Sequence, residues 1–246
     1  MDFKGYLYLN KKIPTEELET KIEYLLKDYN SKVAEIRKFH KSKHIYEVYG
    51  SAEVEGNSLD LVDTKMLLED KIIIDKPYKD IIETLNLNRA LNKYNNIKEY
   101  NIASLLDVHR EITVDLIEDN YVGKLRDCDV YITNTEFIPY HDSEVEFRLE
   151  NALYVFRNSK QQLKDIFKLK WDIVKIHPFI DGNGRLSRLV MNSLLNHRGY
   201  PRLIIEGRIK SVYYKALGKD VEHWYTFCYN LMIYQMIQVL EGGKGN

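Results

Sequence analysis

Residues 177–188, with the sequence HPFIDGNGRLSR, restrict the local fold more strongly than any other part of this chain. Pro178 disfavours helical geometry at the residue before it, so a helix expected over 161–176 should end near His177. The two glycines of the segment permit a tight turn of the backbone. A second helix is expected over 185–197, and the sequence therefore predicts a helix–loop–helix unit.

The loop of this unit has the composition of an anion-binding site. Gly182 and Gly184 let successive backbone N–H groups converge on one point, and the positive N-terminal end of the following helix faces the same point. Arg185 and Arg188 lie three residues apart, hence on one helix face, where they can hold two further phosphate groups. Asp181 supplies a hard oxygen ligand of the kind that Mg²⁺ prefers. These residues predict a site for a polyphosphate and a magnesium ion.

Each of these residues, taken alone, also has an ordinary structural explanation. A histidine after a helix is often a packed or capping residue, Asp-Gly and Asn-Gly are common turn pairs, and arginines in a first helical turn are usually solvated. Phe179 is expected in the core as an anchor of the loop. Taken together, however, the cations and N–H groups converge on one point with His177 beside them as a potential base. This combination favours a functional site.

The segment resembles the signature of the Fic family, HPFx[D/E]GNGRxxR, and it matches at every defining position. Fic proteins typically transfer AMP from ATP to a hydroxyl group of a protein side chain. The resemblance implies that His177 is the general base on the target hydroxyl and that Asp181 is the Mg²⁺ ligand. It implies that Asn183 contacts the α-phosphate and that the two arginines hold the β- and γ-phosphates. The expected nucleotide ligands are Asp181, Gly182, Asn183, Gly184, Arg185 and Arg188.

The chemistry of nucleotidyl transfer is compatible with these residue types. The reaction needs an in-line attack on the α-phosphorus, neutralisation of charge on the pyrophosphate, and removal of the hydroxyl proton. A histidine with an ordinary pKa of about 6.5 can accept that proton at neutral pH.

A second region resembles the flap of the family, a β-hairpin that aligns the target segment beside the nucleotide. It begins with GKLR at 123–126 and continues through Val130, Tyr131, Ile132 and Thr133. The β-branched and aromatic side chains favour a strand, and a turn-like stretch follows. From composition alone, an ordinary structural hairpin is an equally good interpretation.

Tyr213 and Tyr214 resemble the stretch where a tyrosine pair lines the nucleoside pocket of Fic proteins. Paired aromatic residues on a helix are also common in protein cores. The chain departs from the common family pattern after Leu217, where residues 218–220 look shortened and an expected asparagine is absent. The contacts to the adenine base of the nucleotide are therefore the least defined part of the resemblance.

A third motif lies before the Fic-like signature in the chain. Residues 51–57, SAEVEGN, match the inhibitory pattern [S/T]xxxE[G/N] of the family, with Ser51, Glu55 and Gly56 at its defining positions. In family members of this kind the glutamate pairs with the second arginine of the signature, which corresponds to Arg188. The alternative is that Ser51 caps a helix and Glu55 is an ordinary exposed acid. The position of the motif before the signature favours inhibition.

Composition sets broad limits on the protein. The 246 residues are 44% hydrophobic and 30% charged, which suits one globular domain with a substantial core. A net charge of −1 gives no electrostatic case for a nucleic-acid partner. Cys128 and Cys228 form no disulfide framework or metal-binding spacing. Residues 1–4 lack a hydrophobic signal core and no apolar run approaches the ~20 residues of a membrane span, so we expect a cytoplasmic protein without a membrane partner.

Helical periodicity dominates the remaining chain, and further helices are expected over 16–39, 59–70, 78–94, 101–118, 144–157 and 224–240. A weak alternation over 3–9 is compatible with a short strand. The expected fold class is mainly α, a Fic-type helical bundle with a small β-hairpin flap. We expect an N-terminal, largely helical extension (1–50), the inhibitory motif with its following helix (51–70), the catalytic core (71–240) and a flexible tail (241–246).

The resemblance implies an autoinhibited, Mg²⁺-dependent protein adenylyltransferase with ATP as co-substrate. Its expected partner is a Ser, Thr or Tyr hydroxyl of a target protein or of the chain itself, and a homo-oligomer is one option for assembly. Two alternatives stay open. Glu55, held near Asp181 and the metal, could orient water to remove AMP from a modified side chain. Alternatively, the phosphate site only binds a nucleotide in an interaction module, although such a module has no need of the base His177.

Overall fold

The computed structural model of the chain describes residues 15–35, 39–72, 75–95, 97, 99–131 and 137–241. Over these residues the regular secondary structure is helical and no strand occurs. In chain order the elements are α2 (Thr15–Glu35), α3 (Phe39–Glu55), α4 (Leu61–Lys65), the π-helix η1 (Met66–Asp70), α5 (Tyr78–Tyr94), α6 (Ile102–Thr113), α7 (Asp142–Asn158), α8 (Leu163–Ile176), α9 (Asn183–His197), the 3₁₀-helix η2 (Gly207–Ile209), α10 (Lys210–Gly218) and α11 (Val221–Leu240). Among the described helices none is both long and apolar enough to cross a membrane.

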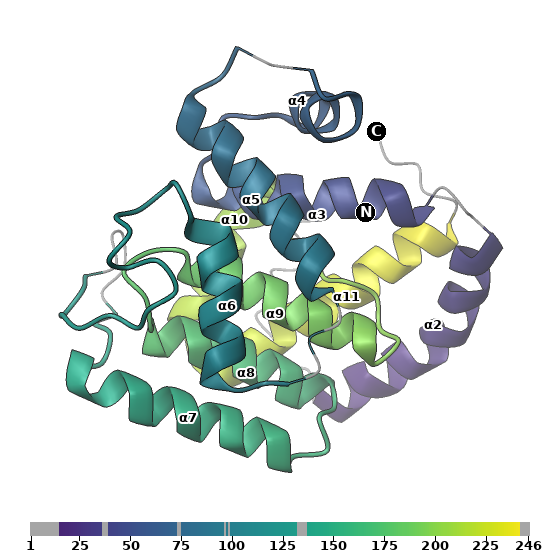
Figure 1. Ribbon diagram of the computed structural model, residues 1–246. Helices are drawn as coiled ribbons and strands as arrows, with labels where there is room; N and C mark the ends of the chain where they lie inside the picture. The colour runs from purple at the N-terminus through teal and green to yellow at the C-terminus, as the bar shows by residue number, and fades with distance from the viewer. Residues whose placement is uncertain are drawn as a thin grey trace.

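Helix α9 lies at the centre of the molecule and packs against α3, α5, α6 and α8 (Figure 1). Twelve of its fifteen residues are buried. Its leucine, valine and methionine side chains join the main hydrophobic core, where each fully buried side chain contributes about 1.5–3 kcal/mol. Because α9 is covered on several sides, its buried polar residues need partners from the helices around it.

Helix α8 delivers the start of the 177–188 segment. A capping box between Gln162 and Asp165 begins the helix, and the spacing of Ile166, Leu169 and Ile173 buries one face of it. The helix ends at its C-cap residue, His177, which adopts the left-handed conformation with φ 51° and ψ 61°. The helix end expected from the following proline is therefore confirmed.

The first described helix shares the same core. Leu18 and Ile22 of α2 are buried and belong to the main hydrophobic cluster. Helix α2 packs along α11, as seen at the right of Figure 1, and the Tyr229 hydroxyl of α11 donates a hydrogen bond to Glu19. Helix α2 is thus part of the folded body.

The helix expected over 16–39 corresponds to α2 as far as Glu35; residues 36–38 lie outside the described residues, and Phe39 is the first residue of α3. The sequence pattern missed α3, since Glu47, Ser51 and Gly50 interrupt any apolar stripe along it. Tertiary packing stabilises this helix instead, with Val48 fully buried. Ser51 lies inside α3 and does not cap a helix.

Other boundaries also differ from expectation. The helix expected over 101–118 ends at Thr113, because Val114 is extended and Asp115 has a positive φ of 62°. The helix expected over 59–70 is a short α-helix continued by a π-helical turn. Helix α10 was not among the expected helices. The expected strand over 3–9 and nearly all of the expected tail, residues 242–246, lie outside the described residues.

Candidate active site

The α8–α9 loop places His177 at the end of α8 and turns the chain into α9. Phe179 is fully buried below the loop, which confirms its expected role as an anchor. The side chain of Asn183 closes the loop, because its Oδ1 accepts from the Phe179 N–H at 3.0 Å and its Nδ2 donates to the Phe179 carbonyl at 2.8 Å. In this structure both polar groups of Asn183 therefore shape the loop.

Two glycines are required at this loop for distinct reasons. Gly182 has a φ of 80°, and a Cβ atom there would lie 2.9 Å from Thr113 Cγ2. A Cβ atom on Gly184 would lie 2.4 Å from Oε1 of Glu55. The first glycine permits the turn, and the second lets a carboxylate approach the N-terminus of α9 closely.

The two arginines of the segment are buried and paired with carboxylates. Arg188 is 4% exposed, and its Nη2 lies 2.7 Å from Glu55 Oε1. Its Nε donates to Ser51 Oγ at 3.0 Å, and its Nη2 also donates to the Ser51 carbonyl at 2.9 Å. Arg185 pairs with Glu83 at 2.7 Å and with Asp181 at 3.0 Å. The structure therefore brings the expected inhibitory residues and both arginines together.

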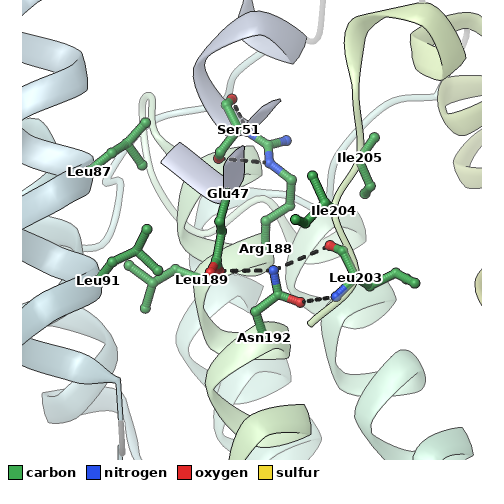
Figure 2. A pocket seen from close by; sticks show the side chains of 10 residues that line it. All are labelled: Glu47, Ser51, Leu87, Leu91, Arg188, Leu189, Asn192, Leu203, Ile204 and Ile205. Carbon is green, nitrogen blue, oxygen red and sulfur yellow. Dashed lines mark hydrogen bonds between the residues drawn. The ribbon is translucent and has the colours of Figure 1, made fainter. Parts of the chain in front are cut away.

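Figure 2 shows how α3 is seated on α9. Arg188 extends towards Ser51, while Asn192, one turn further along α9, donates to Glu47 at 2.9 Å. Asn192 also accepts from the Leu203 N–H at 2.8 Å, which ties in the segment after α9. Glu47, Ser51 and Glu55 recur every four residues and so form one face of α3 that contacts α9. Gly56, with a φ of 97°, ends this helix.

Charge and burial define the ionisation of the central residues. Burial is the largest single effect on the pKa of Glu55 and raises it, but the charge and hydrogen bond of Arg188, together with the charge of Arg185, hold the pKa below its usual value. The pKa of Asp181 is likewise held low by Arg185 against the effect of burial. Burial lowers the pKa of His177, an effect that the Val174 backbone partly offsets. At neutral pH the histidine is therefore neutral and able to accept a proton.

Tyr213 and Tyr214 lie on α10 with their ring centroids 5.1 Å apart. Tyr213 is 1% exposed, and its hydroxyl accepts a hydrogen bond from Nζ of the buried Lys170 at 2.8 Å. Tyr214 is 44% exposed and reaches the Val54 carbonyl of α3 at 3.5 Å. Tyr213 is thus buried in the core and Tyr214 is the exposed member of the pair, and the expected contact with a nucleoside stays a prediction.

The expected flap is described only at its ends. Val130 and Tyr131 lie in an irregular stretch with the Tyr131 side chain exposed, and residues 137–141 are irregular as well. Ile132 and Thr133 lie outside the described residues. The flap interpretation therefore stays a prediction.

Arg126, the last residue of the GKLR stretch, is buried and joins the region of the expected flap to the α8–α9 loop. Its Nε donates to the His177 carbonyl at 2.8 Å, and its N–H donates to the Pro178 carbonyl at 2.9 Å. Its guanidinium also donates to the carbonyls of Cys128 and Tyr140, on the two sides of the flap. One side chain thus connects the backbone of His177 to the two described ends of the expected flap.

His109 on α6 is a site residue to which the sequence assigned no role. Its Nδ1 accepts from the Gly123 N–H at 3.0 Å, so its Nε2 carries the proton and donates to the Asp181 carbonyl, also at 3.0 Å. The ring stacks on Phe179 with centroids 3.9 Å apart. Glu83, the partner of Arg185, was missed too, because it is one of 37 acidic residues and stands in no motif.

This combination of a helical bundle and a histidine–glycine–arginine loop defines the Fic class of proteins. Residues 99–195 match the sequence model of the Fic/DOC family. Protein adenylyltransferase Fic of Aedes aegypti is 32% identical over 216 residues, and that of Drosophila erecta is 34% identical over 214 residues. Each match covers 82% of this chain and 42% of the relative, so the chain spans less than half the length of these relatives. The chain belongs to the Fic/DOC family.

Solved structures agree on the fold. A Fic family protein from Desulfovibrio desulfuricans superimposes with a TM-score of 0.83 at 19% identity, covering 93% of this chain and 75% of that chain. Fic-1 from C. elegans superimposes with a TM-score of 0.77 at 19% identity, covering 94% of this chain and 73% of that chain. The expected Fic-type helical bundle is therefore confirmed.

Proposed function

We propose that this chain is a protein adenylyltransferase that is held in an inhibited state by Glu55. The observation that carries the proposal is the ion pair of Glu55 with Arg188, at the N-terminus of α9 and beside the loop of His177. Relatives that are 32–34% identical are named protein adenylyltransferases, which supports the activity. The proposed co-substrate is ATP, and the proposed acceptor is a hydroxyl side chain of a target protein or of the chain itself.

In the proposed reaction the acceptor oxygen attacks the α-phosphorus of ATP while the bond to the β-phosphate bridging oxygen breaks. His177 takes the hydroxyl proton, AMP becomes esterified to the side chain, and pyrophosphate leaves. The N–H groups at the start of α9, together with Arg185 and Arg188, stabilise charge on the leaving group. Arg126 keeps the loop of His177 in register with the flap that presents the acceptor.

Asp181 would hold Mg²⁺. Its side chain is half exposed and ionised. It lies next to the proposed phosphate cradle, which consists of the N–H groups at the start of α9 with Arg185 and Arg188. This position suits Mg²⁺, which commonly takes one carboxylate, phosphate oxygens and water as its ligands. When bound, the ion would neutralise charge on the phosphates. The role of Asp181 is to hold the ion beside Arg185, to which the carboxylate is bonded in this structure.

Inhibition follows from the geometry of Glu55. Its Oε1 lies close to Gly184 at the start of α9 and engages the guanidinium that the γ-phosphate would need. A carboxylate in this place repels the phosphate charge and removes its partner. ATP that binds without this contact is placed out of line for transfer.

The test is incubation with labelled ATP and Mg²⁺, followed by mass spectrometry for AMP on hydroxyl side chains. Glu55→Gly should raise modification at least about tenfold, since ~1.4 kcal/mol of bias between ATP orientations has that effect. Adding His177→Ala to the Glu55→Gly protein should lower transfer by about 10²- to 10⁴-fold relative to Glu55→Gly alone, the usual effect of losing a general base. Unchanged transfer in the double variant would refute the role of His177.

Glu53→Gln is the matched control for charge. Glu53 lies two residues from Glu55, accepts from the Gly207 N–H at 2.6 Å and from the Tyr49 hydroxyl at 2.7 Å, and does not contact Arg188. Glutamine retains the acceptor oxygen, whereas glycine would release the segment before α10. Transfer by Glu53→Gln should equal that of the wild type.

A second candidate function is removal of AMP from a modified side chain. It is favoured by the charge interaction of Glu55 with Asp181, because a carboxylate near the proposed metal ligand is placed to orient a water molecule. In that case Glu55→Gly would lose AMP removal from a premodified protein. The same labelled assay, run in both directions, separates the two functions.

A further inference from the structure

Glu83 stands outside every motif of the sequence, yet it lies in the phosphate cradle. It is on α5, is 6% exposed, and its Oε1 is 2.7 Å from Nη1 of Arg185. Its second oxygen, Oε2, accepts from Nδ2 of Asn57 at 2.7 Å. Both carboxylate oxygens are therefore engaged, and the side chain has a fixed position within the folded body.

Arg185 thus has two carboxylate partners in different surroundings. The Glu83 side chain is 8% exposed, whereas the Asp181 side chain is 49% exposed. Asp181 is open to solvent, from which a nucleotide and a metal would enter, whereas Glu83 is buried within the protein. Of the two partners, Asp181 is the one that can exchange.

We propose that Glu83 is a positioning residue of the nucleotide site, which holds the inner edge of Arg185 while the outer edge exchanges Asp181 for phosphate. This inference rests on the proposed function, since it takes Arg185 as the ligand of the β-phosphate. An arginine has five N–H donors, so Nη1 can keep Glu83 while Nη2 turns to a new acceptor. The ion pair with Glu83 keeps the positive charge of the buried guanidinium balanced while the other partner is exchanged.

Asn57 connects the Glu83–Arg185 pair, here called the clamp, to α3, the helix that carries Glu55. It lies two residues after Glu55, donates to Glu83 and to the Asp80 carbonyl, and accepts from the Leu59 N–H at 3.0 Å. The end of α3 therefore contacts one arginine through Glu55 and the other through Asn57 and Glu83. If inhibition is relieved by a movement of the Glu55 side chain alone, the clamp is preserved. If the whole end of α3 is displaced, the clamp is disturbed.

The test measures binding of ADP and of AMP by calorimetry, with Mg²⁺, in the Glu55→Gly protein with and without Glu83→Gln. Glu83→Gln should weaken ADP about tenfold, within the range expected when a charge-assisted contact is lost, and should leave AMP unchanged. A residue that only stabilises the fold would not discriminate between the two nucleotides.

Glu47→Gln is the control for burial and charge. Glu47 is 5% exposed and also forms an ion pair with an arginine, Arg202, but it does not contact Arg185. Its substitution should leave the ratio of ADP to AMP affinity unchanged. Asn57→Ala keeps the charge of Glu83 and removes one of its anchors, so it should produce a smaller loss that is also selective for ADP. This variant tests the clamp even if Glu83→Gln folds poorly.

Equal weakening of ADP and AMP in these variants, or no change in either, would overturn the proposal. Tighter ADP binding would also overturn it, because Glu83 would then compete with phosphate for Arg185. Arg185→Ala separates this inference from the proposed function. If Arg185→Ala leaves ADP binding unchanged, the phosphate assignment itself fails. If it weakens ADP while Glu83→Gln does not, only the positioning role fails.

Discussion

His109 and Asn183 organise the α8–α9 loop through contacts that use every polar atom of their side chains. Asn183 bonds twice to the backbone of Phe179, and His109 bridges the Gly123 N–H and the Asp181 carbonyl. A neutral imidazole can make both bonds of His109, because one nitrogen accepts and the other donates. A protonated ring would lose the bond to the Gly123 N–H.

This requirement predicts how stability depends on pH. Burial lowers the pKa of His109 to about 4, below the ordinary value of an unfolded histidine. Between about pH 6.5 and pH 4, His109 is therefore protonated in the unfolded chain but neutral in the folded chain. The stabilising contribution is complete above pH 6.5, and about 2 kcal/mol of it should be lost on acidification to pH 5.

Urea unfolding at pH 7.5 and pH 5 checks this prediction by comparing the wild type with His109→Gln. The variant lacks the titrating group, so its stability should fall by about 2 kcal/mol less over this interval. An equal fall in both proteins would show that His109 is not protonated on unfolding.

Helix α3, a firmly packed element, carries Glu55, the glutamate that we propose to be inhibitory. Val48 and Val54 are fully buried, and Glu47 is bonded to Arg202 and to Asn192. The close approach of α3 to the segment before η2 depends on Gly50, where a Cβ atom would lie 2.9 Å from the Ile205 carbonyl oxygen. Such packing favours regulation at the Glu55 side chain over release of the helix.

Gly50→Ala should therefore destabilise the protein by about 1–3 kcal/mol, as expected when a methyl group is forced into a packed contact. The contact is with backbone, which cannot move aside without shifting one of the two segments. Gly218→Ala is the control, because a Cβ atom there has no neighbour within 4 Å and the backbone is not left-handed. Chemical denaturation should show a loss for Gly50→Ala alone; an equal loss for both would point to a general effect of glycine replacement.

Across the molecule, packing separates the proposed nucleotide cradle from α2, the first described helix. Helix α2 packs on α11, whereas the cradle is built from α3, α5 and the α8–α9 loop (Figure 1). Both regions nevertheless belong to one hydrophobic core. A defect in α2 is therefore expected to lower stability without changing the cradle.

Ile22→Ala tests this separation. Ile22 is fully buried on α2, so its truncation should cost about 2–5 kcal/mol, whereas Tyr24→Ala, at a side chain that is 76% exposed, should cost little. Calorimetry well below the unfolding temperature should give wild-type ADP affinity for both variants. A lower affinity of folded Ile22→Ala would contradict the separation.

Local patterns account for much of the fold and for the identity of the central residues. The helix expected over 78–94 has those bounds in the structure, and the proline after His177 ends α8 as expected. These features depend on side-chain period and backbone restriction, which act over a few residues. Helix α3 could not be foreseen in this way, because it is stabilised by burial against helices distant in the sequence.

The residue types of the cradle, namely the histidine, the glycines, the acid and the two arginines, can be read along the chain because they lie within twelve positions. Their partners cannot. Glu83 stands in no motif, and Arg126 is marked only by the GKLR stretch; the packing of α5, α6 and residues 123–126 around α9 makes these two residues and His109 partners of the site. The physical reason is burial: a polar group that leaves water must be satisfied, and the fold decides which side chain is near enough to do so.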